Sequence, residues 1–155
     1  MIKKFQEYFK ESISFPTTKD QVVKLCKKYK IKNYSINPDF SIDVEGNVNL
    51  SYLSLKSLPL RFSRVEGYFD CRYNLLTTLE GSPREVKYLH CSNNPVMEIL
   101  NKFPDPNKAL KLWDDFNVVR NGNELSVYRF KEMYLDLTGR EFKGDLVFKG
   151  YKVVE

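Results

Sequence analysis

The chain has 155 residues, of which 42% are hydrophobic and 14% aromatic, and a formal charge of +5. This composition excludes a disordered chain, the length favours one domain with its own core, and no apolar run reaches the roughly 18 residues of a membrane span. Three cysteines and a polar start, MIKKFQEYFKES, without the apolar core of a signal peptide, predict a soluble, reduced, cytoplasmic protein with no membrane partner.

Two helices are expected in the first part of the chain. Residues 2–10 and 18–30 each carry an apolar stripe at helical spacing, and Thr17 or Thr18 can cap the second helix. The stretch that follows, IKNYSINPDFSIDV, reads as extended chain broken by a turn at Asn-Pro-Asp. We expect this stretch to add a strand at the edge of the sheet that follows.

A repeat of about 20 residues occupies the middle of the chain. The sequence VEGNVNLS at residues 44–51 returns as VEGYFDCR at residues 65–72, and a third copy, one residue shorter, aligns Val86 with Val65. The order apolar-x-apolar-x-x-Asn at this period is typical of a leucine-rich-repeat coil. We therefore expect one short strand in each copy, at residues 48–51, 69–72 and 89–92.

Alternation along these strands divides their side chains between two faces of a sheet. The side chains expected to face the core are those of Val48, Leu50, Phe69, Cys71, Leu89 and Cys91. The side chains expected to face outward are those of Asn47, Asn49, Ser51, Tyr68, Asp70, Arg72, Tyr88, His90 and Ser92. This outward set is the candidate protein-binding site, because its tyrosines are rigid and amphipathic and its charged pair could set the register of a partner.

Helices are expected again after the repeats. Pro95 and Pro106 suit the first helical position behind Asn94 and Asp105, and residues 126–138 carry an apolar stripe that stops at a glycine. The tail FKGDLVFKGYKVV alternates like a strand or a small hairpin.

These elements predict one compact domain of the α+β class. Residues 36–95 would form a short leucine-rich-repeat-like solenoid of about three strands, residues 1–35 an N-terminal helical cap, and residues 96–155 a helical C-terminal unit. The caps are needed because each coil leaves its apolar ends open.

The repeat segments INPDFSIDVEGNVNLS, LKSLPLRF, VEGYFDCRYNLLTTLEGSP and EVKYLHCSNNP resemble the degenerate leucine-rich-repeat proteins of tailed bacteriophages, built on units of the form C-S-x-N-x-L-T-S-L-E-G-x-P-x-x-V. The similarity covers roughly residues 17 to 103. It implies a scaffold without shared catalytic residues, in a phage protein that binds a host protein of defence or gene expression inside the infected bacterial cell. The chain departs from the pattern in having about two and a half units and Leu53 in place of the first repeat asparagine.

The asparagines and cysteines of the repeats have structural explanations. Asn74 is expected to satisfy backbone groups where the chain leaves the strand, whereas Asn94 could instead cap the helix at Pro95. Cys71 and Cys91 would lie on neighbouring strands, close enough for a disulfide or part of a metal site. The chain has no Cys-x-x-Cys and its single histidine faces the other way, so we expect buried thiols and no metal.

Catalysis has little support in the sequence. His90 with Asp70 and Arg72 or Ser92 is the one suggestive group, but a three-strand sheet offers a flat surface where catalysis needs a convergent pocket. Phosphate loops of the GxxxxGK type, GxGxxG and HExxH are absent. We therefore expect no enzymatic activity and no cofactor, and keep a small enzyme with a pocket between the coil and the C-terminal helices as a third alternative.

The first 35 residues hold nine lysines and three acidic residues, which accounts for all of the positive excess. Such a cluster could meet a nucleic-acid backbone in a strongly salt-dependent way, although solvated lysines on a capping helix are ordinary. Nucleic-acid binding is therefore the second hypothesis. Its candidate residues are Lys24, Lys27, Lys28, Lys30 and Lys32.

The size of the sheet limits the first hypothesis. Three strands about 4.8 Å apart with four residues of about 3.3 Å each present only about 200 Å², against roughly 800 Å² per partner in a standard interface. For tight binding, we expect either a homo-oligomer or a surface enlarged by the tail or by the C-terminal helices that carry Trp113, Phe116, Tyr128 and Tyr134.

Overall fold

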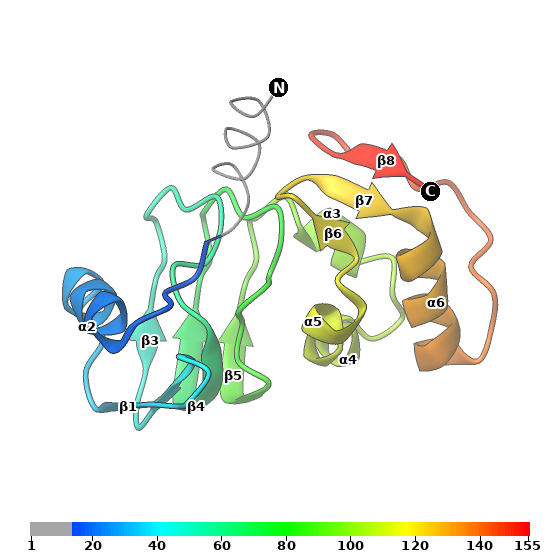
Figure 1. The fold of residues 1–155 in the computed structure, drawn as a ribbon. Coiled ribbons are helices and arrows are strands. Elements are labelled where there is room, and N and C mark those ends of the chain that lie inside the picture. The colour runs from blue at the N-terminus through cyan, green and yellow to red at the C-terminus, as the bar shows by residue number, and fades with distance from the viewer. Residues whose placement is uncertain (1–13) are drawn as a thin grey trace. The chain divides into compact units, whose positions relative to one another are not determined.

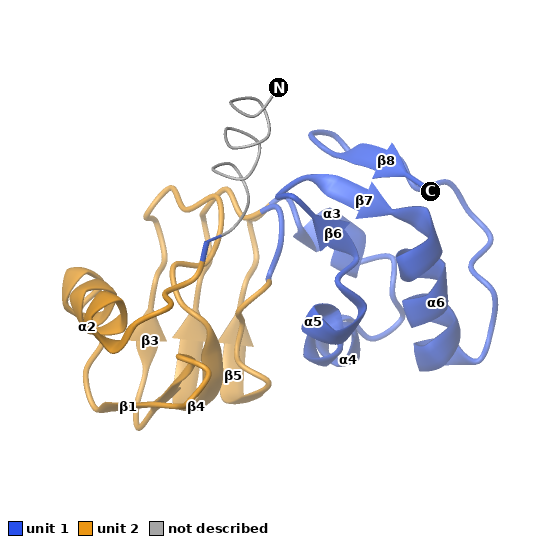
Figure 2. Ribbon diagram, viewed as in Figure 1, with its two compact units in different colours: residues 1–14, 77–79, 95–155 blue, residues 15–76, 80–94 orange. Residues whose placement is uncertain are grey.

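The computed structural model describes residues 14–155, which divide into two compact units (Figure 2). Unit 2 consists of residues 15–76 and 80–94. Unit 1 contains residues 77–79 and 95–155 together with Ser14. The helix expected at residues 2–10 lies outside the described residues. The expected α+β class is confirmed, since the described chain holds five helices and two sheets (Figure 1). None of these helices has the length and apolar character that crossing a membrane requires.

Unit 2 begins with helix α2 (Lys19–Lys28), which confirms the second expected helix. Two reciprocal hydrogen bonds cap its first turn. The Thr18 hydroxyl accepts one from Gln21 N, and the Gln21 side chain accepts one from Thr17 N. Val22 and Cys26 lie on the buried face of the helix. The apolar stripe and the threonine cap were therefore sufficient to locate this element.

The main sheet of unit 2 has five strands. Strands β2, β3 and β5 all pair with β4 in parallel, and only β1 pairs in antiparallel fashion, with β2. Because β5 pairs along most of β4, β2 and β3 must share the opposite edge of β4, one along its first half and one along its second. The strands are β1 (Tyr34–Ile36), β2 (Ile42–Val44), β3 (Val48–Asn49), β4 (Phe62–Asp70) and β5 (Glu85–His90).

The strand register follows the repeat. Val48 pairs with Phe69 and Phe69 with Leu89, at the sequence spacings of 21 and 20 that align the copies. The strands themselves begin earlier than expected, since β4 extends back to Phe62 and β5 back to Glu85. A close backbone approach explains one repeated glycine, because a Cβ atom at Gly67 would overlap the Asn47 side chain.

The inward-facing side chains of the sheet are buried in the first two copies of the repeat and half-buried in the third. Val48 and Phe69 are at most 1% exposed, as expected for the inward face. Leu89 and Cys91 are only half-buried. Within the described chain β5 pairs with no strand except β4, which makes it the last strand of the sheet and explains the difference.

Unit 1 combines four helices with a second sheet. The helices are α3 (Met97–Leu100), α4 (Pro106–Lys111), α5 (Trp113–Phe116) and α6 (Val127–Thr138). The strands are β6 (Val119–Arg120), β7 (Glu124–Ser126) and β8 (Lys152–Val154), in the order β6-β7-β8. The tail strand expected near the C-terminus exists, but it pairs in parallel with β7 and forms no hairpin with its neighbours in sequence.

The helix boundaries of unit 1 follow the expected capping residues with one exception. Asp105 caps α4 through Asn107 N and Lys108 N, with Pro106 as the first helical residue. The α6 helix ends at a left-handed Gly139 with φ 69°. The exception is α3, which begins at Met97, two residues later than Pro95.

The core of unit 1 is aromatic. Trp113 is 1% exposed and its indole N–H donates a hydrogen bond of 3.0 Å to the Thr78 hydroxyl. Phe103 packs on Phe130 with ring centres 4.7 Å apart, and the Tyr151 hydroxyl donates to the Thr77 carbonyl at 2.7 Å. Residues 77–79, which lie inside the repeat region in sequence, thus belong to this core.

The expectation that Trp113 enlarges a binding surface is therefore wrong. Of the four aromatic residues named for that role, Phe116 and Tyr134 are half-buried, and only Tyr128 is well exposed, at 65%. Core packing against residues distant in sequence accounts for the burial of Trp113, and helical periodicity alone could not show it.

Candidate protein-binding site

The parallel register brings the outward set together in rows across the sheet. Tyr68 pairs with Tyr88, and Asp70 pairs with His90 on one side and Asn49 on the other. The residues that follow the strand ends continue this pattern through backbone hydrogen bonds. Exposure is highest for Asn47, Asn49, Arg72, Tyr88, His90 and Ser92, whereas Ser51 and Tyr68 are half-buried.

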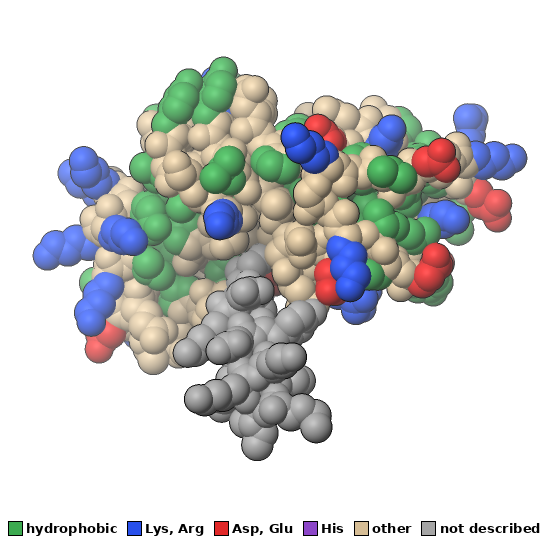
Figure 3. All heavy atoms as spheres, turned by 90° about the horizontal axis from the view of Figure 1, so that it is seen from above, with side chains coloured by type: hydrophobic (Ala, Val, Ile, Leu, Met, Phe, Trp, Pro, Cys, Tyr) green, Lys and Arg blue, Asp and Glu red, His purple; other side chains and the backbone are tan. Residues whose placement is uncertain are grey.

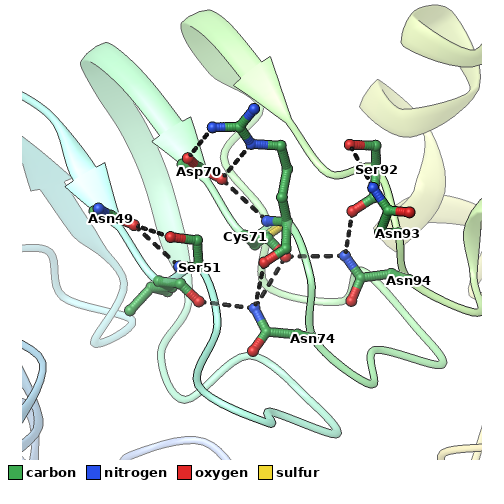
Figure 4. Close-up of polar contacts among 10 residues, drawn as sticks. Asn49, Ser51, Asp70, Cys71, Asn74, Ser92, Asn93 and Asn94 are labelled. Atoms are coloured by element: carbon green, nitrogen blue, oxygen red, sulfur yellow. Dashed lines mark hydrogen bonds and ion pairs between the residues drawn. The ribbon is translucent and has the colours of Figure 1, made fainter.

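Asp70 is the exception on this face, because Arg72 covers it. Only 6% of Asp70 is exposed, and its two carboxylate oxygens accept hydrogen bonds from Arg72 N, Nε and Nη2 at 2.8–3.0 Å (Figure 4). The Arg72 side chain, with the backbone N–H of Arg72 and the nearby His90, holds the pKa of Asp70 below its usual range. A partner would therefore meet the guanidinium of this neutral pair and not the carboxylate.

The pH dependence of stability tests this pair. Because folding lowers the Asp70 pKa, the pair stabilises the fold above pH 4 and its contribution is lost as the pH falls through the lowered value. Replacing Asp70 by Asn should therefore cost about 2 kcal/mol at pH 7 and much less at pH 2.5. Urea unfolding at both pH values measures this difference.

The matched control is Glu66→Gln in the exposed Arg64–Glu66 pair, which should change stability little at either pH. An Asp70→Asn loss of equal size at both pH values would contradict the assignment.

Asn74 performs the structural role expected of a repeat asparagine. Its Oδ1 accepts hydrogen bonds from Leu53 N and Leu55 N at 2.9 and 3.1 Å, and its Nδ2 donates to the carbonyls of Leu50 and Cys71 at 2.7 and 3.0 Å. The residue is 6% exposed. It therefore joins its own copy of the repeat to the preceding one and is unavailable for chemistry.

Asn94 does the same one copy later. Its Oδ1 accepts from Leu76 N at 3.1 Å, and its Nδ2 donates to the carbonyl of Cys91 and, as Figure 4 shows, to that of Cys71. The alternative that Asn94 caps the helix after Pro95 is wrong, since α3 has no side-chain cap.

Two stacked tyrosines follow the strand ends in the first two copies of the repeat, and the sequence analysis does not predict them. Tyr52 and Tyr73 follow equivalent strands, both with left-handed backbones, at φ 57° and 55°. Their rings stack with centres 4.5 Å apart and planes within 8°, and they are 69% and 46% exposed. The repeat spacing of 21 aligns these two residues, but the alternation that predicts the exposed face ends with the strands and does not extend to them.

Two leucines from the same loops extend this exposed surface. Leu53 is 45% exposed and Leu75 50%, although large apolar side chains are usually buried. We call the set Tyr52, Leu53, Tyr73 and Leu75 the tyrosine platform. Figure 3 shows hydrophobic side chains exposed among basic ones on the left-hand part of the surface, which unit 2 forms.

The lysines of the second hypothesis lie along α2 and the turn after it. All five are exposed, with Lys24, Lys27 and Lys28 in the helix and Lys30 and Lys32 beyond it. Lys28 Nζ also lies 5.3 Å from the centre of the Tyr29 ring. The arrangement is that of a solvated helix face, and it leaves the cations accessible to an anionic partner.

The three cysteines are thiols whose surroundings disfavour the reactive thiolate form. No disulfide joins Cys26, Cys71 or Cys91. Burial raises the pKa of all three thiols, that of Cys91 to about 11, so the reactive thiolate is scarce at neutral pH. Among residues 14–155 no cluster of His, Cys, Asp and Glu could hold a metal ion.

A hollow of about 350 Å³ lies among described residues of unit 1. It is lined by Pro104, Asp105, Lys108, Tyr134, Leu137, Thr138 and Arg140. Two of its polar groups already serve the fold, since Asp105 caps α4 and the Thr138 hydroxyl bonds to the Tyr134 carbonyl. The hollow therefore carries no assignment of its own.

Comparison with known proteins adds no assignment: no family model matched the chain, and neither the curated proteins nor the solved structures contained a match. The chain is therefore described by its own geometry, as an α+β protein in which a mixed, mostly parallel sheet carries an exposed polar face and a tyrosine platform.

Proposed function

We propose that this protein is a non-enzymatic protein-binding module and that unit 2 carries its binding surface. The observation that supports this most directly is the continuity of the outward sheet face with the tyrosine platform. Tyr52 N donates to the Arg72 carbonyl and Tyr73 N to the Ser92 carbonyl, so the hydrogen bonding between neighbouring copies continues from the strand ends, at Asn49 and Asp70, to the tyrosine three residues later. Rigid aromatic side chains beside polar ones are characteristic of protein interfaces.

The tyrosine platform also adds area to the sheet face, which alone is too small for a standard interface. A tyrosine offers about 200 Å², so the exposed parts of Tyr52 and Tyr73 add roughly 230 Å² to the roughly 200 Å² of the sheet face. The sum is still about half of a standard interface side. We therefore expect a moderate affinity unless further surface takes part.

In this proposal unit 2 is a short leucine-rich-repeat-like coil of three parallel rungs, and the resemblance to phage repeat proteins supports a host protein as the partner. Binding would modulate that protein, of defence or gene expression, by covering part of its surface inside the infected cell. No bond-making step is needed for this mechanism.

Capture from a bacterial lysate tests the proposal. The tagged protein should retain one host protein after nuclease treatment and at high salt. Replacing Tyr68 and Tyr88 together by alanine should weaken capture at least tenfold, as for interface tyrosines, while changing the melting temperature little. Tyr128→Ala in unit 1 is the matched control, since Tyr128 is 65% exposed and Tyr88 58%, and it should leave capture unchanged.

Two results would contradict it. Loss of all capture after nuclease would favour nucleic-acid binding through the lysines of α2. Unchanged capture by the double variant would place the binding surface away from the sheet face.

A further inference from the structure

We propose that the space over Asn93, beside the ring of Tyr73, is the docking position for an aromatic side chain of the partner protein. This rests on the proposed function and makes it specific, since it names the kind of group recognised and the place where it binds.

The third copy of the repeat provides this place. Tyr73 N donates to the Ser92 carbonyl at 3.2 Å, as Tyr52 N does to the Arg72 carbonyl, and Asn93 has φ 58°, close to the values of the two tyrosines. The ring spacing of 4.5 Å is nearly the spacing of neighbouring strands. A ring at position 93 would thus stack on Tyr73, but the chain has an exposed asparagine there (Figure 4).

Stability does not explain why tyrosines occupy the first two places. A left-handed backbone is unfavourable for a bulky L-residue, and Asn tolerates it better. Stacking of one ring pair offsets part of this cost, and Tyr52 and Tyr73 are both exposed. Unfavourable backbone conformations that packing does not offset are commonest at functional sites, which supports a role in recognition.

Charge and polarity decide which occupant fits. Bases stack well on tyrosine, but single-stranded nucleic acid also needs cations for its phosphates. Asp70 already neutralises Arg72, the cation that precedes Tyr73 in the chain. The flanking side chains of the platform are Leu53 and Leu75, which favour an apolar protein surface over a phosphate backbone. The Arg72 Nη1 group, which Asp70 does not use, can donate to a carbonyl of the partner's main chain.

Amide NMR spectra of the full chain with N-acetyl-tryptophanamide as the probe test this inference. The amide signals of Tyr73, Leu75 and Asn93 should shift in a saturable way in the millimolar range, with the ring-current direction of a stacked indole. N-acetyl-leucinamide is the matched aliphatic probe and should shift them at least fivefold less.

Two substitutions at one position sharpen the test. Asn93→Tyr supplies the missing ring from the chain itself, in a backbone conformation that two tyrosines already adopt. It should abolish the probe's shifts at Tyr73 and Leu75, because the new ring then covers Tyr73. Asn93→Gly relaxes the left-handed residue, leaves the place open and should preserve them.

Three outcomes would overturn the inference: no shift at Asn93, unchanged probe shifts at Tyr73 and Leu75 in Asn93→Tyr, or stronger shifts of the same amides with adenosine monophosphate. Its failure is distinguishable from that of the proposed function. If the host protein is still captured by Asn93→Tyr, the docking position is wrong and the protein-binding function stands. If the probe binds but no protein is ever captured, the converse holds.

Discussion

Replacing Asn74 by alanine is expected to destabilise unit 2 by about 3 kcal/mol, because one buried amide holds two copies of the repeat together. Its oxygen serves the backbone N–H groups of Leu53 and Leu55, and its nitrogen serves the carbonyls of Leu50 and Cys71. Alanine leaves these buried backbone groups without their partner, and each costs free energy.

Urea unfolding followed by far-UV circular dichroism measures the loss. Asn74→Asp separates the two halves of the amide, since it keeps the acceptor for Leu53 and Leu55 and removes the donor. The control is Asn49→Ala, an exposed asparagine of the same sheet whose Oδ1 bonds only within its own turn, to Ser51, and which should cost below about 1 kcal/mol. Equal losses for Asn74→Ala and Asn49→Ala would refute the assigned role.

The second large effect is expected in unit 1, where Trp113→Ala should cost about 4 kcal/mol. The side chain is the largest among the fully buried ones, so its removal leaves a cavity and also ends the hydrogen bond to Thr78. Trp113→Phe keeps much of the apolar volume and loses the N–H donor, and should cost less than half as much.

Hydrogen exchange of the α6 amides reports this loss inside unit 1, because destabilisation raises the population of open forms. Tyr128→Ala, at an exposed position of the same helix, should leave exchange nearly unchanged. Slow exchange retained by Trp113→Ala would show that the indole does not hold the core together.

The sequence predicted the part of the fold that repeats. Val48 pairs with Phe69 and Phe69 with Leu89, which are the residues that the repeat spacing aligns. The small sheet of unit 1 could not be foreseen, since β7 and β8 are three residues each, too short for a periodic signal, and they pair across a long stretch of sequence.

Alternation predicted which residues form the candidate site, but not which of their polar groups stay exposed. The outward face assembles as alternation indicated, but the burial of Asp70 depends on the conformation of its neighbour Arg72. The stack of Tyr52 on Tyr73 lies in loops, where alternation gives no guidance and only the repeat spacing points to a contact.

The hydrogen bonds of Asn74 and Asn94 also have a consequence for how a chain of this kind can gain or lose copies of the repeat. Asn74 and Asn94 both bond to their own copy and to the copy before it, so each repeat carries the groups that attach it to its predecessor. Tandem duplication of one copy would therefore deliver a new rung with its attachment already encoded. It would widen the outward face by one row, so the number of copies sets the width of this face.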